Sequence, residues 1–136
     1  MMPVEALETG IYSLLSGDAS LITELGGTAI YNKRAPQSPP EKYVIFQWQG
    51  GGDENETPNR TRNVVYAVFG VAATQADAAG IDSAIDAALH QSSVSVSGWT
   101  NFWTAREEDV NLAQEDAGGV TKYQVGGLYR IRIDLD

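Results

Sequence analysis

The sequence predicts an α+β fold: a mostly antiparallel sheet of four to five strands, an amphipathic helix packed on one face, and an N-terminal helix pair. Along residues 122–135, apolar and polar residues alternate with the period of a strand. Along residues 78–89, apolar residues recur at helical spacing. Strand-like segments follow one another as hairpins, which favours antiparallel pairing. The 136 residues suffice for one core, so we expect a single domain, 1–136.

The composition excludes several classes of protein. The chain is 43% hydrophobic and has no cysteine, so disulfides, thiolate metal sites and cysteine nucleophiles are ruled out. It has no apolar run of the roughly 18 residues that a membrane helix needs and no pattern typical of a signal peptide, so we expect synthesis in a cytoplasm. A net charge of −9 argues against a protein that grips DNA phosphates.

Two helices are predicted at the N-terminus. Apolar residues at helical spacing indicate a helix from about Pro3 to Ser16, which Gly17 would end. A second, short helix is expected to begin at an Asp18 or Ser20 cap and to end at Gly26–Gly27.

The next segments predict a long hairpin. After a possible short strand at residues 28–31 and a proline-rich connection, residues 43–48 are rich in β-branched and aromatic side chains. Residues 63–72 are apolar on both faces, which indicates a central strand. Between them, residues 50–59 contain glycine, acidic residues and proline but no apolar side chain, and we expect a mobile loop there.

The second half of the chain predicts a helix followed by another hairpin. The helix is expected from Thr74 or Gln75 to Gln91, and residues 91–98 form either a loop or a weak edge strand. A strand over residues 99–107, which residues 108–112 continue, would use three bulky side chains as anchors, namely Trp99, Phe102 and Trp103. Residues 114–119 form the turn, and residues 122–135 return as the centre of the sheet, with a bulge or bend at Gly126–Gly127.

No pattern predicts a catalytic, cofactor-binding or metal-binding residue. His90 is the only histidine and lies at a helix end, where a surface role is the simpler interpretation. Glu107, Glu108 and Asp109 are adjacent in a strand, so their carboxylates point to different faces and do not converge on a cation. Arg130 and Arg132 could bind an anion, but pairing with acidic residues of the strand around residues 106–109 is the favoured interpretation.

Four segments, taken in order, carry a resemblance to a known family. They read PVEALETGIYSLLSGDASLITEL, GGTAIYNKRAPQSPPEKYVIFQ, VVYAVFGVAATQADAAGIDSAIDAALHQ and REEDVNL…YQVGGLYRIRIDL. This series resembles the tail terminator, or tail completion, proteins of long-tailed (siphovirus-like) bacteriophages and related phage-like particles. The glycine-rich acidic hairpin loop is more polar than is usual for that family.

The resemblance implies a structural virion protein without catalysis or cofactor, located in the tail or neck. Such a protein forms a homo-hexameric ring, caps the tail tube, stops its polymerisation and docks the head through connector or completion proteins. Double-stranded DNA passes through the lumen without specific binding, and no membrane is involved.

Two hairpin loops are the candidate assembly interfaces. The first contains Gly51, Asp53, Glu54, Glu56, Arg60 and Arg62, and the second contains Gln114, Glu115 and Asp116. Three alternatives remain open: another neck component, such as a head completion or head–tail joining protein; a small ligand-binding or enzymatic α+β domain; and a toxin–antitoxin or regulatory partner domain.

Overall fold

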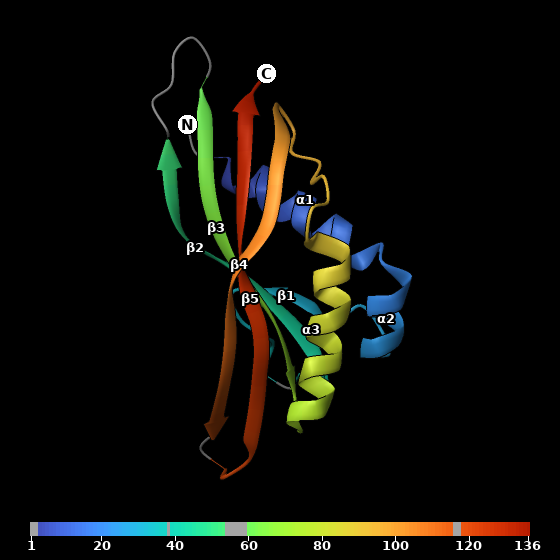
Figure 1. The fold of residues 1–136 in the computed structure, drawn as a ribbon. Coiled ribbons are helices and arrows are strands. Elements are labelled where there is room, and N and C mark those ends of the chain that lie inside the picture. The colour runs from blue at the N-terminus through green and yellow to red at the C-terminus, as the bar shows by residue number, and fades with distance from the viewer. Residues whose placement is uncertain (1–2, 38, 54–59, 116–117) are drawn as a thin grey trace.

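The sheet and the helices form two layers (Figure 1). The computed structural model describes residues 3–37, 39–53, 60–115 and 118–136. In this part of the chain, three helices lie on one face of a five-stranded sheet with strand order β1-β2-β3-β5-β4. The elements are α1 Val4–Ser16, α2 Ala19–Leu25, β1 Ile30–Asn32, β2 Tyr43–Asp53, β3 Thr61–Ala72, α3 Gln75–Leu89, β4 Trp99–Glu115 and β5 Thr121–Leu135. The α+β prediction with an N-terminal helix pair is confirmed.

Side-chain caps fix the start of two helices. The Asp18 carboxylate accepts a hydrogen bond from the backbone N–H of Leu21 at 2.9 Å, so Asp18 rather than Ser20 is the cap of α2. The Thr74 hydroxyl accepts from the N–H of Asp77 at 3.2 Å and caps α3. Gly26, in the left-handed conformation, ends α2 as predicted.

The C-terminal strand β5 lies inside the sheet, between β3 and β4, and pairs antiparallel with both. β2 also pairs antiparallel with β3, whereas β1 is parallel to β2. The sheet is therefore mostly antiparallel, as predicted, and β3 and β5 have neighbours on both sides.

The main core lies between the sheet and the helices. Alternate residues of β5 supply Tyr129, Ile131 and Ile133, which are each at most 1% exposed. They pack with apolar side chains of all three helices, including Leu7, Ile11, Leu21, Ile81 and Ile85. The opposite face, which we call the open face, has a smaller buried cluster of Ala29, Tyr43, Ile45 and Val71. β3 contributes to both clusters, which confirms the central position predicted from its two apolar faces.

The segment between α3 and β4 crosses α1 at very short range. A Cβ atom at Gly10 would lie 2.2 Å from the carbonyl oxygen of Ser95. Only glycine allows this approach, which accounts for a glycine inside a helix. Within residues 92–98, Val96 forms a single bridge with Trp99 and no regular strand.

The predicted bulge was placed on the wrong strand. β5 pairs with β3 without interruption through Gly126 and Gly127. The irregularities lie on β4, between Asn101 and Trp103 and between Arg106 and Glu108. The two glycines instead permit close approach, because Cβ atoms there would meet Phe69 at 2.3 Å and Arg106 at 2.6 Å.

Candidate functional site

The first predicted loop is shorter than its composition suggests. β2 continues through Asp53, which pairs with Arg62, so Gly51, Asp53 and Arg62 belong to strands rather than to a loop. Arg62 is only 8% exposed. Gly51 adopts a φ of 110°, and a Cβ there would lie 2.0 Å from the carbonyl oxygen of Asn63. Strand pairing therefore overrides the loop-like composition of residues 50–53.

Of the remaining candidate residues of this loop, the structure describes only Arg60. Arg60 is exposed and directly precedes β3. Glu54 and Glu56 lie outside the described residues.

Two of the three candidate residues of the second loop belong to a strand. Gln114 and Glu115 belong to β4, which extends three residues beyond its predicted end at residue 112, and Asp116 lies outside the described residues. The Gln124 side-chain amide donates to Gln114 Oε1 at 3.0 Å across the β4–β5 ladder. The two hairpins point to opposite ends of the sheet, so the two candidate loops are far apart (Figure 1).

An arginine cluster that the sequence did not predict connects β4 to α3. The Arg106 guanidinium donates to both carboxylate oxygens of Asp82, at 2.6 and 3.1 Å. It also donates to Asp109 at 2.9 Å and to the carbonyl oxygen of Gly126 at 2.7 Å. We call Arg106, Asp82, Asp109 and Tyr129 the Arg106 cluster. It fixes the long β4–β5 hairpin to the helix layer.

The electrostatics of this cluster favour a permanent cation. Burial opposes the charge of Arg106, but the hydrogen bonds that its guanidinium donates to Asp82 and Tyr129 outweigh this effect and raise the arginine pKa above its ordinary value. Burial also raises the pKa of the Tyr129 hydroxyl, which donates to Asp86 at 3.1 Å. A permanently protonated arginine therefore joins two carboxylates, a backbone carbonyl and a neutral tyrosine, and this network connects β4 to α3.

The acidic run of β4 is divided between two arginines. Asp109 pairs with Arg106, whereas Glu107 Oε1 accepts from Arg130 Nε at 2.7 Å on the open face. The predicted pairing of Arg130 with an acidic neighbour is confirmed. Among the residues that the structure describes, no group of three potential ligands could hold a metal ion.

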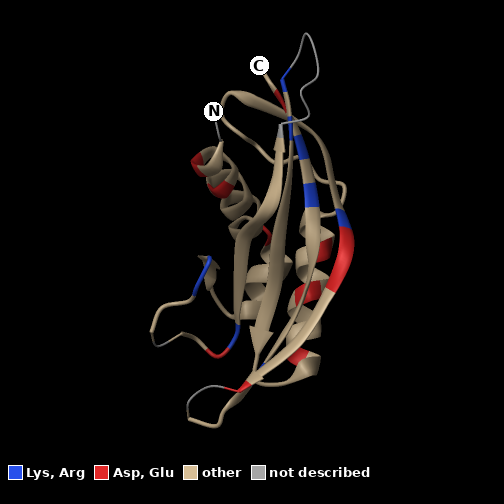
Figure 2. Ribbon diagram, turned by 90° about the vertical axis from the view of Figure 1, so that its left-hand side faces the viewer, with Lys and Arg blue, Asp and Glu red and all other residues tan. Residues whose placement is uncertain are grey.

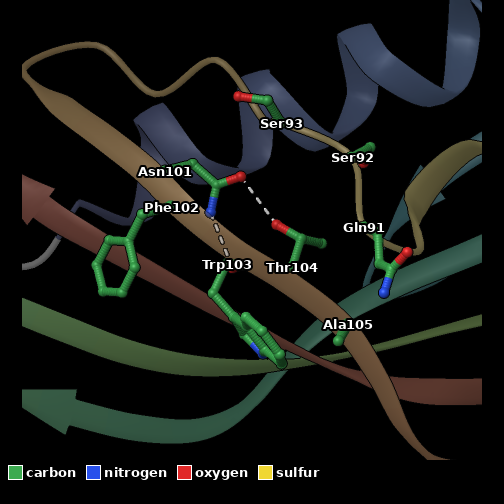
Figure 3. Close-up of a pocket in the computed structure, with 8 residues that line it drawn as sticks. All are labelled: Gln91, Ser92, Ser93, Asn101, Phe102, Trp103, Thr104 and Ala105. Atoms are coloured by element: carbon green, nitrogen blue, oxygen red, sulfur yellow. Dashed lines mark hydrogen bonds between the residues drawn. The ribbon is translucent and has the colours of Figure 1, made fainter.

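Two of the predicted anchor residues lie on the surface. Trp99 is 5% exposed, but Phe102 and Trp103 are 46% and 49% exposed. The bulge between Asn101 and Trp103 is the reason, because it interrupts the alternation of side chains along β4. Phe102 and Trp103 therefore project from the same side of the strand (Figure 3). The Arg132 guanidinium lies 5.0 Å from the centre of the Phe102 ring.

A shallow hollow of about 370 Å³ lies beside these aromatic residues, between β4 and residues 91–93. Asn101 stabilises the wall of this hollow. Its side-chain oxygen accepts a hydrogen bond from Thr104 Oγ1 at 2.8 Å (Figure 3). The same oxygen accepts a second one from the N–H of Val94, also at 2.8 Å. The Asn101 amide nitrogen donates to the carbonyl oxygen of Trp103 at 2.9 Å. Exposed tryptophan, phenylalanine and arginine are typical of protein–protein contact surfaces.

The helices of the described chain are neither long nor apolar enough to cross a membrane. His90 is exposed at the end of α3, where its Nδ1 accepts from the backbone N–H of Arg106 at 3.2 Å. The histidine therefore helps to join α3 to β4.

Comparisons with known proteins identify a family and a shared fold. A family model described as "Tail completion protein gp17" matches residues 9–133. A solved structure titled "Virion of native gene transfer agent (GTA) particle" contains a chain with the same fold, at a TM-score of 0.78 and 19% identity over 96% of each chain. A comparison with curated proteins found no match.

Proposed function

The chain belongs to the tail completion protein gp17 family, a family of structural proteins of phage and phage-like virions, and from this premise we propose that it caps the tail tube. In this proposal the protein forms a homo-hexameric ring on the last layer of the tube. The ring stops polymerisation and presents the surface to which the head connector docks. The observation that carries the proposal is the family match over nearly the whole chain.

The shape of the chain supports a role in assembly. The long β2–β3 and β4–β5 hairpins point to opposite ends of the sheet (Figure 1), so one copy has two separate ends for two different partners. The tail tube and the head connector are the partners we propose for these ends.

The exposed aromatic surface around Phe102 and Trp103 supports a role in protein contacts. Side chains of this size that are about half exposed are better explained by a partner than by the stability of the isolated chain. A specific contact buries on the order of 1,200–2,000 Å². This surface would form only part of such an area.

The charge of the chain suits a ring through which DNA moves. A net charge of −9 repels phosphate, so double-stranded DNA would pass through the lumen without being held. We therefore propose that DNA is a passenger and not a specific ligand.

The deciding experiment is electron microscopy of particles from cells in which an early stop codon interrupts this gene, with a plasmid copy as the control. A terminator gives tails of uncontrolled length that are detached from full heads. Tails of normal length beside separate heads would instead identify a head completion or head–tail joining protein. Intact infectious particles would refute both.

A further inference from the structure

Positive side chains are absent from the helices, whereas negative side chains occur in both layers of the molecule. The three helices contain six carboxylates and neither lysine nor arginine; the carboxylates are Glu5, Glu8, Glu24, Asp77, Asp82 and Asp86. All nine lysine and arginine residues therefore belong to strands and connecting segments. Figure 2 shows this division: the helices carry red segments only, and the blue segments lie on the strands and loops.

The open face of the sheet has a groove bordered by positive charge. The groove has a volume of about 340 Å³ and lies between the segment after β1 and the β4–β5 hairpin. Its floor consists of Tyr43, Ile45, Phe69 and Val71, which are neighbours across the β2–β3 ladder. Lys33 and Arg34 form one wall.

Backbone hydrogen bonds fix the wall of this groove. Lys33 adopts a left-handed φ of 70°, and its N–H donates to the carbonyl oxygen of Phe46 at 2.9 Å. The N–H of Arg34 donates to the carbonyl oxygen of Asn32 at 2.8 Å. Both side chains are exposed, so two cations stand at the edge of an apolar floor. At the far side, Lys122 Nζ lies 5.2 Å from the centre of the Tyr43 ring.

We infer that the open-face groove binds the acidic helix layer of a second copy of this chain. Asp77, Asp82 and Asp86 of α3 already lie within 4.0 Å of Lys42 or Arg106. Charge complementarity with Glu5 of α1 and Glu24 of α2 carries the inference, because an apolar groove with a cationic rim matches an acidic helix surface. The inference rests on the proposed ring and identifies its subunit contact. The two surfaces lie on opposite faces of one molecule, so the contact is heterologous and propagates from copy to copy until rotation closes the ring.

Charge reversal tests the contact in purified protein at high concentration and in particles from complemented cells. The groove variant is K33E/R34E, and the helix variant is E5K/E24K. Each places like charges across the contact and should weaken self-association by about tenfold or more, as sedimentation and native mass spectrometry would show. R60E, which reverses an exposed cation at the other end of the sheet, is the control for self-association and should self-associate in purified protein as the wild type does.

Two combinations of these substitutions should restore assembly, because each of them restores the charge complementarity. The four-substitution variant K33E/R34E/E5K/E24K has the wild-type net charge and complementary faces of reversed sign. A mixture of the two double variants should also assemble, because each helix layer then finds an opposite charge on the other variant's groove. If the groove variant fails and neither combination restores assembly, the groove binds a different protein and the inference is wrong.

Cross-linking gives a second measurement because the chain has no cysteine. A flexible bismaleimide should join R34C/E5C copies into a ladder of multimers and leave the R34C and E5C single variants as monomers. Dimers of the R34C single variant would show that two sheet faces meet. Complete particles without a ladder would also refute the contact. The ladder in purified protein and the stop-codon particles are independent results, so a failure of this contact and a failure of the capping role can be told apart.

Discussion

Arg106 and Asp82 form an ion pair with two hydrogen bonds across the interface between sheet and helix. The two nitrogen–oxygen distances are 2.6 and 3.1 Å, and the side chains are only 16% and 15% exposed. Parallel hydrogen bonds between a guanidinium and a carboxylate are directional as well as strong. This pair therefore fixes the angle at which the β4–β5 hairpin leaves the molecule.

Arg106→Ala is expected to lower the free energy of unfolding by about 3–5 kcal/mol, because it leaves the buried Asp82 carboxylate without its partner. Arg130→Ala is the matched control. The Arg130–Glu107 pair is 33% and 43% exposed, and its loss should cost less than about 1 kcal/mol. Urea denaturation of the two variants measures the difference. Equal losses would show that the Arg106 cluster contributes no more than a surface ion pair.

Gly127→Ala should destabilise the same region. The new Cβ would lie 2.6 Å from Arg106 Nε and 2.8 Å from the carbonyl oxygen of Glu108, and a backbone oxygen cannot move aside easily. We expect a loss of about 1–3 kcal/mol. Gly52→Ala is the control, because no atom lies within 4 Å of its Cβ position and a gain of about 0.5 kcal/mol is expected. Thermal unfolding measures the change in stability of both variants. Equal melting temperatures for the two would contradict the close approach at Gly127.

Tyr66 and Tyr129 make stability fall at alkaline pH. Burial raises the pKa of both hydroxyls above the unfolded value of about 10, so the folded protein keeps protons that the unfolded chain has lost. The contribution of the two tyrosines to the free energy of unfolding is complete below pH 10 and is lost as the pH rises above 10. Each tyrosine should contribute a slope of about 1.4 kcal/mol per pH unit. Urea denaturation between pH 8 and 11.5 measures the slope.

Phenylalanine variants separate the two tyrosines. Tyr66→Phe should leave stability at pH 7 unchanged or slightly higher, because the buried Tyr66 hydroxyl has no hydrogen-bond partner among the described residues. Tyr129→Phe should cost about 1–3 kcal/mol at pH 7, since Asp86 and Arg106 lose a partner. Both should reduce the alkaline slope. An unchanged slope in either variant would contradict the effect of burial for that tyrosine.

Trp99 and Trp103 are expected to have opposite roles within one strand. Trp99→Ala should destabilise the fold by about 3–5 kcal/mol, because the indole is buried in the main core. Trp103→Ala should leave the melting temperature nearly unchanged and should reduce the yield of complete particles. Differential scanning fluorimetry and particle counts from complemented cells give the two readings. Normal particle yields with Trp103→Ala would remove this aromatic surface from the proposed assembly contacts.

The elements that sequence reasoning placed correctly are those in which one period covers the whole segment. The alternation from Tyr123 to Ile133 identified β5, and the apolar stripe from Ala78 to Leu89 identified α3. Residues 50–53 were assigned to a loop because glycine and aspartate disfavour strands, but pairing with residues 62–65 outweighs that preference. A weak local preference therefore yields to a well-formed neighbouring strand.

The candidate site was harder to predict because its geometry arises from bulges and distant contacts. One inserted residue on β4 turns both Phe102 and Trp103 towards solvent, and composition alone does not mark the insertion. Arg106 and Asp82 are separated by 24 residues and meet only after α3 packs on the sheet. One signal was available: Gly127 in an otherwise apolar strand face indicates that a bulky side chain lies over it, and this side chain is Arg106.

The position of β5 between β3 and β4 has a consequence for the order of folding. The Thr61 hydroxyl donates to the carboxylate of Asp134, and these residues are 73 positions apart. During synthesis, β3 and β4 are complete before the strand that joins them exists, so each exposes an unpaired edge until β5 arrives. Sheets built from such distant pairs fold slowly, because a long loop must close before any contact forms. The sheet of this protein can therefore close only after β5 has been synthesised, and the helix layer must protect a half-formed sheet until then.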